Sequence, residues 1–282
     1  MKKLISLILA FVMIASTLVF FSSCNSEKDD NKIYVGMECG YAPFNYTQAD
    51  DSNGAVKISN ADGYANGYDV MIAKKIAEEL GKELVIVKYD FDALINGVMT
   101  GALDFIIAGM SPTAKRKESI DFTDAYYESQ LVLVVRKDGA YANATSLADF
   151  AGANLVAQIG TFHDIALNAQ ASAVGYTAAT PMADFPAMIN ALKTKAIDGY
   201  VAEEPGAVAD CAANDEFTYI KLQNNTTGFI ASAEDVQIAV GLKKGNSELV
   251  AQINAALAKL SAEERLNMMT QATNLSVGDN VQ

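Results

Sequence analysis

Apolar segments of strand length alternate with amphipathic helical segments along most of the chain, and this alternation constrains the fold more than any other feature. The run 33–37 (IYVGM) is predicted as a first strand. The segment 67–81 is predicted as a helix that places Val70, Ala73 and Ile76 on one face and stops at a glycine. Strands separated by helices are typical of an α/β fold with a mostly parallel sheet. Further segments are predicted as strands at 83–89, 104–110, 131–138, 154–160 and 237–245, as helices at 91–101 and from 161, and as a helix followed by a strand across 185–205.

The same order of elements occurs twice, which predicts two α/β lobes followed by a pair of C-terminal helices. Ser247 is expected to cap a helix that extends to about residue 260, and Ser261 with Glu264 forms a capping box for the last helix. Between the first strand and the first helix, residues 47–66 are polar and rich in Asp, Asn and Gly. The length of this segment indicates a functional loop or a surface flap.

The N-terminal segment has the features of a secretory signal. Two lysines precede an uncharged run, 4–21, and two serines then stand directly before Cys24. This ending resembles the lipobox of bacterial lipoproteins, which implies a signal peptide at 1–23, acylation of Cys24 and a lipidated tether at 24–31. The alternative is an uncleaved anchor, because an uncharged, mostly apolar run of 18 residues is near the lower limit for spanning a bilayer. Both interpretations place the rest of the chain outside the cytoplasmic membrane.

Charge and ligand-forming side chains exclude several classes of protein. Lys and Arg number 21 against 34 Asp and Glu, for a net charge of −13, and no basic stripe is present, so nucleic acid is not expected as a partner. Three cysteines without a CxxC pair and a single histidine are too few for a structural zinc site or a disulfide framework. Cys39 and Cys211 could form a disulfide outside the cytoplasm, but they lie 172 positions apart in segments assigned to different lobes, so two buried thiols are expected. No metal or cofactor is expected.

Four segments of the chain occur in a recognisable order: YAPFNY (41–46), the helical segment 67–81, the stretch 91–127 and DGYVAEEP (198–205). Together they resemble signature regions of the extracellular solute-binding proteins, family 3, which serve polar amino-acid ABC importers. The resemblance covers nearly the whole chain after the signal segment. Met71 departs from the family pattern, which usually has a second acid at this point of the helix; the position is expected to be structural.

The resemblance implies a two-lobed fold of the type II periplasmic-binding-protein class. Lobe 1 would comprise 32–129 and 238–282, and lobe 2 would comprise 130–237. Two crossover strands would join the lobes, and the C-terminal helices would pack on lobe 1. The ligand would bind between the lobes, which agrees with the general rule that open α/β sheets bind ligands beyond the carboxyl ends of their strands.

The function implied by the resemblance is capture of a free polar amino acid and its delivery to the transmembrane subunits of an ABC permease. The protein would be a monomer anchored by its lipid to the outer face of the cytoplasmic membrane, or periplasmic. The alternative is an enzyme on the same fold, similar to a dehydratase of small carboxylic acids, since a fold does not determine a function. His163, the only histidine, would have to serve that enzyme; it is expected instead to lie at the rim of lobe 2.

A free amino acid carries a carboxylate and an ammonium, so its site needs a fixed donor and a fixed acceptor. Arg116 matches the family's carboxylate-binding arginine, and a planar guanidinium meets both carboxylate oxygens at once. The alternative is a solvated charge, because Lys115 and Lys117 flank it. Thr161 and Phe162 follow a predicted strand and open a helix, where unpaired N–H groups bind anions; an ordinary helix cap is the alternative there.

The other two parts of the implied site are an acceptor for the ammonium and a pocket for the side chain. Glu203 occupies the family's acidic position, with Glu204 as the alternative, and Ser111 and the carbonyl of Gly109 would complete the acceptor set. An acid between two rings suits a cationic side chain, so lysine or arginine is the expected ligand. Residues that match this pocket are Glu38, Tyr41 and Phe91, while Phe44 and Tyr46 fit the pocket and the core equally well.

Overall fold

The computed structural model describes residues 28–277, and the elements below belong to one compact unit that begins at Asn31. The expected signal peptide, 1–23, and the expected acylation site, Cys24, lie outside the described residues. Within 28–277, no helix combines the length and the apolar composition that a membrane crossing requires.

The first five-stranded sheet has the order β6-β1-β7-β14-β8. β1 is parallel to β6 and β7, whereas β14 is antiparallel to β7 and β8. Four of the five strands therefore run in the same direction, as a mostly parallel sheet predicts. The reversed strand is β14, which returns to the sheet in the sense opposite to β8. In sheet order, the strands are Glu83–Lys88, Lys32–Met37, Phe105–Ile106, Gln237–Lys243 and Ile120–Glu128.

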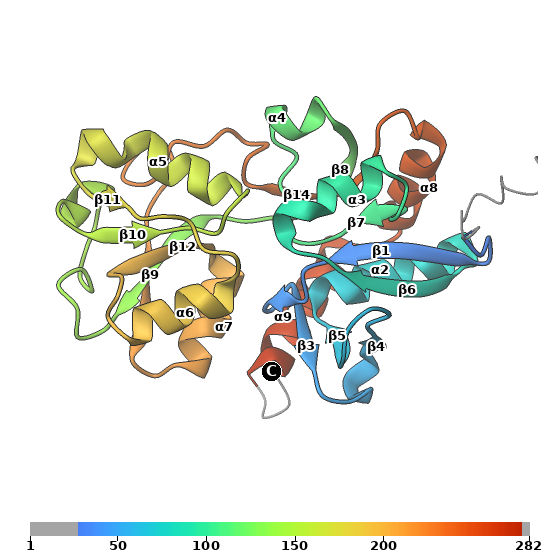
Figure 1. Cartoon of the computed structure of the whole chain (residues 1–282), viewed down its shortest axis with the longest axis horizontal. Coiled ribbons are helices and arrows are strands. Elements are labelled where there is room, and N and C mark those ends of the chain that lie inside the picture. The colour runs from blue at the N-terminus through green and yellow to red at the C-terminus, as the bar shows by residue number, and fades with distance from the viewer. Residues whose placement is uncertain (1–27, 278–282) are drawn as a thin grey trace, which may run out of the picture. The chain divides into compact units, whose positions relative to one another are not determined.

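Helices cover both faces of this sheet (Figure 1). Side chains alternate between the two faces of a strand, so Phe105 and Ile107 pack in the same core as α2 and α8, and Ile106 and Ala108 pack on the side of α3. α2 ends where Gly81 adopts a left-handed conformation, as the sequence predicts. The helices are α2 (Tyr68–Leu80), α3 (Leu94–Met99), which follows a short 3₁₀ turn η2 (Phe91–Ala93), and α8 (Ser247–Ala258).

The second five-stranded sheet has the order β11-β10-β12-β9-β13. β10 is parallel to β11 and β12, and β9 is antiparallel to β12 and β13. α5 packs on one face, and α6 and α7 pack on the other. In sheet order, the strands are Thr177–Ala178, Asn154–Val156, Gly199–Glu203, Leu131–Arg136 and Phe217–Lys221, and the helices are Phe162–Val174, Phe185–Lys193 and Glu204–Ala213.

Two chain segments join the sheets, and we call the part built on the first sheet lobe 1 and the part built on the second lobe 2. The first connection runs from β8 to β9 and the second from β13 to β14. The connections lie side by side, because the N–H of Ser129 donates to the carbonyl of Val236 at 2.9 Å. Two adjacent crossovers of this kind are the usual architecture of a hinge.

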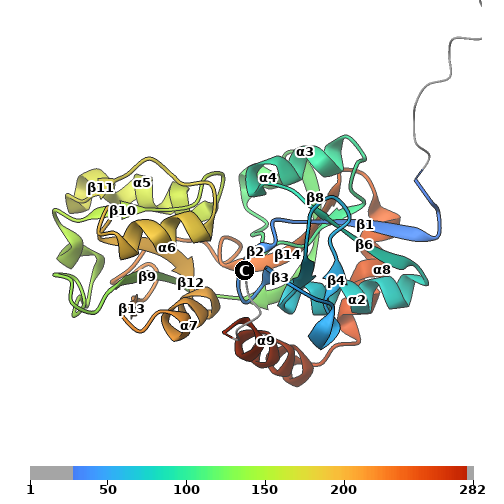
Figure 2. The ribbon, with the colours of Figure 1, turned by 60° about the horizontal axis from the view of Figure 1, so that its bottom comes forward.

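The C-terminal helices return to lobe 1, where α8 and α9 (Ala262–Ser276) pack against α2. α9 also contacts α7 of lobe 2, and the two helices lie next to each other in Figure 2. The capping box of Ser261 and Glu264 is present. The expected cap at Ser247 is wrong by one residue, because the side chain of Asn246 accepts from the N–H of Leu249.

The segment 47–66 contains more regular structure than the predicted loop. It contributes to a small four-stranded sheet with the order β2-β3-β5-β4. The amide of Gln48 donates to the carbonyls of Asp50 and Ser52, both at 2.9 Å, and this holds the turn at the tip. Strands this short have no readable alternation in the sequence. The four strands are Gly40–Tyr41, Asn45–Gln48, Tyr64–Asn66 and Val56–Lys57.

Candidate functional site

The lobes meet around a small cavity, which we call the central cavity. Its volume is about 10 Å³, which leaves room for about one water molecule. Eight of the nine residues that the resemblance implies for the ligand line it, and Glu38 is the exception. The lining residues come from both lobes and are Tyr41, Phe91, Ala108, Gly109, Ser111, Arg116, Gln158, Thr161, Phe162, His163, Phe185 and Glu203.

Arg116 is buried in the central cavity, so the alternative of a solvated charge is wrong for this residue. It lies on α4 (Ala114–Lys117), a single turn whose N-cap, Thr113, accepts from the N–H of Arg116 at 3.3 Å. Only 8% of Arg116 is exposed, whereas its neighbour Lys115 pairs with Glu118 in solvent. The cap and the short turn therefore point one residue of a basic run inward.

The guanidinium of Arg116 reaches across the gap between the lobes. Its Nη1 donates to the carbonyl of Ser111 at 2.8 Å, and its Nη2 donates to the carbonyl of Gly160 in lobe 2 at 3.0 Å. The group also lies over the ring of Phe91, 5.3 Å from the centroid. Burial lowers the pKa of Arg116 to about 10, so the side chain keeps its charge at neutral pH.

Thr161 and Phe162 lie where helix α5 begins, on the lobe 2 side of the cavity. The hydroxyl of Thr161 accepts from the N–H of Asp164 at 3.3 Å and donates to the carbonyl of Gln158 at 2.6 Å. The hydroxyl therefore serves as an ordinary helix cap, which is the alternative that the sequence left open. The start of a helix also carries positive partial charge, so this wall of the cavity favours an anion.

Glu203 lines the cavity from lobe 2, at the junction of β12 and α7. Its carboxylate accepts from the hydroxyl of Tyr41, a lobe 1 residue, and its Oε1 lies 2.9 Å from Nε2 of His163. Burial opposes ionisation, but the His163 imidazole and these hydrogen bonds hold the pKa of Glu203 below its ordinary value. Glu203 is therefore an anion buried between the two lobes.

Two neighbours of Glu203 differ from the expectations. His163 is buried, with 5% exposed, so its predicted place at the rim of lobe 2 is wrong. Its Nδ1 is buried without a hydrogen-bond partner among the described residues. Glu204 does not line the cavity and forms an ion pair with Lys221 at 2.7 Å. Of the two adjacent acids, only Glu203 faces the site.

Glu38 lies beside the central cavity and not in it. Its Oε2 accepts from the amide of Gln158 in lobe 2 at 2.6 Å, and its Oε1 is buried without a partner among the described residues. Burial raises the pKa of Glu38 to about 8, although the bond from Gln158 acts in the opposite direction. A buried carboxyl with one unsatisfied oxygen is poised to accept another donor.

Glu38 faces a second cavity of about 310 Å³, which we call the acidic cavity. Phe91 lines both cavities, so the acidic cavity adjoins the central one. Among residues 28–277, no three His, Cys, Asp or Glu side chains are grouped closely enough to hold a metal ion. The charged residues of this cavity are four acids and one lysine, namely Glu38, Asp62, Asp90, Asp184 and Lys88.

A buried network that the sequence did not reveal holds the turn after Glu38. Asp69 of α2 accepts from the amide of Asn45 at 2.8 Å and from the hydroxyl of Tyr126 at 2.6 Å. Asn45 in turn accepts from the N–H of Cys39 at 2.8 Å, where the backbone has a positive φ of 54°. Through Asn45, Asp69 thus holds the strained turn at Cys39 that positions Glu38.

The two cysteines and two of the aromatic residues singled out in the sequence lie away from the central cavity. Cys39 is buried and Cys211 is half-buried, and both are free. Phe44 and Tyr46 are buried core residues and do not line the central cavity.

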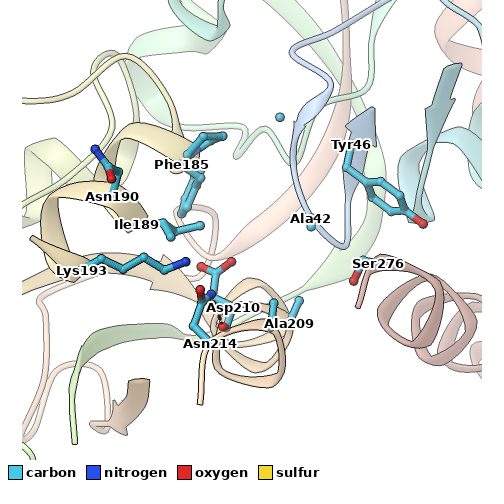
Figure 3. A pocket seen from close by; sticks show the side chains of 13 residues that line it. Ala42, Tyr46, Phe185, Ile189, Asn190, Lys193, Ala209, Asp210, Asn214 and Ser276 are labelled. Atoms are coloured by element: carbon cyan, nitrogen blue, oxygen red, sulfur yellow. Dashed lines mark hydrogen bonds between the residues drawn. The ribbon is translucent and has the colours of Figure 1, made fainter. Parts of the chain in front are cut away.

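A third cavity, of about 320 Å³, lies on the far side of Phe185 between α6, α7 and the 40–46 segment of lobe 1 (Figure 3). Phe185 lines this cavity and the central one, and its ring stacks on Tyr41 with the centroids 4.1 Å apart. Asp210 points into the space and accepts from the hydroxyl of Tyr200 at 2.6 Å. Phe185 is therefore the wall between the two cavities, and no pattern in the sequence predicted this role.

Comparison with known proteins gives a consistent result. The profile of the family described as bacterial extracellular solute-binding proteins, family 3, matches residues 33–272. The arginine-binding extracellular protein ArtP of Bacillus subtilis is 26% identical over 95% of this chain and 96% of its own length. A probable histidine-binding protein of Campylobacter jejuni is 29% identical over 77% of this chain and 79% of its own.

Solved structures match the same fold. An amino acid ABC transporter substrate-binding protein from Streptococcus pneumoniae, bound to L-arginine, superposes with a TM-score of 0.74 and 26% identity, covering 86% of this chain and 94% of that one. The arginine-bound form of truncated ArgBP from T. maritima superposes with a TM-score of 0.67 and 29% identity, covering 82% and 97%. The two-lobed α/β architecture expected from the sequence is confirmed.

Proposed function

The chain belongs to family 3 of the bacterial extracellular solute-binding proteins, and from this premise we propose that it captures a free polar amino acid between its lobes and delivers it to the permease of an ABC importer. One observation carries the proposal: a buried guanidinium and a buried carboxylate, Arg116 and Glu203, line the same cavity between the lobes. Opposite charges at two ends of one cavity complement a zwitterion.

We assign the ligand contacts as follows. Arg116 binds the ligand carboxylate from lobe 1, and the start of α5 at Thr161 and Phe162 meets it from lobe 2. Glu203 accepts from the ligand ammonium, with Ser111 and Gly109 as further acceptors. Charge-assisted hydrogen bonds contribute about 1.5–3 kcal/mol each, so a few of them reach the ~8 kcal/mol of a micromolar complex.

The side chain of the ligand is cationic in this proposal. Beyond Phe91, the acidic cavity offers the unsatisfied oxygen of Glu38 and three further acids against one lysine. Lysine or arginine suits this charge pattern, and relatives named as arginine-binding support the choice. Phe91 and Tyr41 provide the aromatic walls along the aliphatic part of such a side chain.

Capture requires the lobes to move, because the central cavity is far smaller than an amino acid. We propose that lobe 1 comprises 32–129 and 238–282, that lobe 2 comprises 130–237, and that the two crossovers act as the hinge. The lipobox-like ending at Cys24 supports a lipid-anchored protein at the outer face of the cytoplasmic membrane. It would act as a monomer with a permease as its membrane partner.

The alternative, an enzyme similar to a small-acid dehydratase, has less support. His163 uses Nε2 for Glu203, and within 28–277 no hydroxyl is hydrogen bonded to its ring, so the serine–histidine pair of a nucleophilic site is missing. We therefore propose binding without chemical conversion.

The test of this proposal is a thermal-shift screen of the purified protein against the twenty amino acids, followed by calorimetry of those that stabilise it. Arginine or lysine is expected to raise the melting temperature most, and mass spectrometry is expected to recover the ligand unchanged. Small-angle scattering is expected to give a smaller radius of gyration at saturation. A chemically altered product would support the enzyme, and no stabilisation by any amino acid would contradict the proposal.

A further inference from the structure

Tyr41 belongs to lobe 1, but its ring also packs against residues of lobe 2. Only 4% of this residue is exposed, and its ring stacks on Phe185 at an interplanar angle of 16°. Its hydroxyl donates to the carboxylate of Glu203 and accepts from the backbone N–H of the same residue at 3.4 Å. Tyr41 therefore bridges the lobes in the arrangement that also brings Arg116 onto Gly160.

A missing side chain makes room for this ring. A Cβ atom built on Gly206 would lie 3.0 Å from Cε2 and 3.3 Å from the hydroxyl oxygen of Tyr41, closer than the 3.5–4.0 Å optimum for such contacts. Other groups confine the ring as well. Its Cε1 edge lies close to the backbone of Gly109, where a Cβ would be 3.2 Å away, and the ring stacks on Phe44 and Phe185.

The backbone at this position does not itself require glycine. Gly206 lies in the first turn of α7 and does not have a positive φ. Alanine is the better helix former, so glycine here weakens the helix it belongs to. The feature that glycine does permit is the close approach of Tyr41 from the other lobe.

We propose that the arrangement closed around a ligand keeps the contact between Tyr41 and Gly206, and that Gly206 is a positioning residue for lobe closure: its bare backbone is the seat that receives Tyr41. The inference rests on the proposed function, because it concerns the closing step of amino-acid capture. Observed affinity falls when the binding-competent arrangement is less populated. A side chain at 206 therefore weakens binding without touching the ligand.

The variant Gly206→Ala tests this, because it is expected to keep or raise the stability of the protein while it lowers the affinity for the ligand. The melting temperature of the protein without added amino acid is expected to stay the same or to rise by about 2 °C, because alanine favours the helix. The Kd for L-arginine in calorimetry is expected to rise about tenfold, and scattering is expected to show incomplete compaction at saturation. Val208→Ala is the matched control, since it raises helix propensity at an exposed position of α7 and is expected to bind like the wild type.

A double-mutant cycle with Tyr41→Ala shows whether Gly206→Ala acts through its contact with the Tyr41 ring or through a general change in lobe 2. In the Tyr41→Ala background, Gly206→Ala is expected to change the Kd by less than twofold, because the ring that it obstructs is absent. An equal loss in both backgrounds, or wild-type affinity and full compaction in the single variant, would overturn the inference. If wild-type protein binds neither arginine nor any other amino acid, it is the proposed function that fails.

Discussion

The central cavity contains one buried positive charge, Arg116, and one buried negative charge, Glu203, which we call its positive and negative ends. The two charges differ in the partners that they already have. Arg116 donates to two backbone carbonyls, and no carboxylate within 28–277 lies at ion-pair distance from it. Glu203 already contacts the imidazole of His163 and the hydroxyl of Tyr41. A ligand carboxylate would thus meet a buried charge that is influenced by Glu203 and Asp235 but has no carboxylate of residues 28–277 at ion-pair distance, whereas a ligand ammonium would share an acceptor. We therefore expect the positive end to contribute more to affinity than the negative end.

The largest effect is expected from Arg116→Ala. Without the guanidinium, the ligand carboxylate is buried without its charged partner, and the Kd for arginine is expected to rise about 1,000-fold, or ~4 kcal/mol. The melting temperature without ligand is expected to change little, because the guanidinium donates its hydrogen bonds to two backbone carbonyls and otherwise lies over the ring of Phe91. Lys115→Ala, at the exposed neighbouring position, is the control. Calorimetry that gives Arg116→Ala a Kd within tenfold of wild type would remove Arg116 from the site.

A smaller loss is expected from Glu203→Gln. The amide keeps the size of the side chain and can still accept a hydrogen bond, so the expected increase in Kd is about 30-fold, or ~2 kcal/mol. Glu204→Gln is the matched control, because Glu204 pairs with Lys221 outside the cavity. If Glu203→Gln costs more than Arg116→Ala, the ranking of the two ends is reversed.

The sequence could identify these two ends because each lies in a segment that resembles the family. Arg116 lies in a short helix that is capped by Thr113, within the matching segment 111–117. Glu203 is the last residue of β12, which the apolar sequence before it predicts as a strand. The alternation of strands and helices was sufficient for the architecture. It was not sufficient for the direction of β14 and β9, because a returning strand has the same local pattern whichever way it runs.

The residues that sequence reasoning missed or misplaced depend on contacts between distant segments. Gln158 and Phe185 become part of the site only because lobe 2 faces lobe 1, and nothing in their local sequence encodes that approach. His163 was expected at the rim, but the first turn of α5 directs it to Glu203. Glu38 was expected in the pocket for the ligand side chain, and the turn held by Asn45 directs it to the acidic cavity, beside the central one.

A third prediction extends the comparison to the side-chain end of the site. Because the pKa of Glu38 is about 8, this carboxyl is mostly protonated at pH 7. Pairing with a guanidinium favours the ionised form and lowers this pKa, so arginine binding is expected to release a proton. Affinity for arginine is therefore expected to increase between pH 6 and pH 9, by about tenfold.

Calorimetry at pH 7 in buffers of different ionisation enthalpy measures this proton directly. Citrulline, whose side chain is neutral, is the control ligand and is expected to release none. Glu38→Gln is expected to abolish the release and to lower arginine affinity about tenfold, with little effect on citrulline. Proton release that persists in Glu38→Gln would assign the titrating group elsewhere and leave the acidic cavity without a role.

The smallest effect is expected from His163→Leu. This change leaves Glu203 with fewer partners, as Arg116 is left without an ion-pair partner at the positive end. Leucine removes one partner of Glu203, so the protein without ligand is expected to lose about 1–2 kcal/mol of stability, or a few degrees in melting temperature. The ligand ammonium then supplies the missing partner, and the Kd for arginine is expected to fall about threefold. The stabilisation by arginine in a thermal-shift assay should therefore exceed that of the wild type. If affinity falls instead, as for Glu203→Gln, His163 contacts the ligand itself and the contrast between the two ends is smaller than their present contacts indicate.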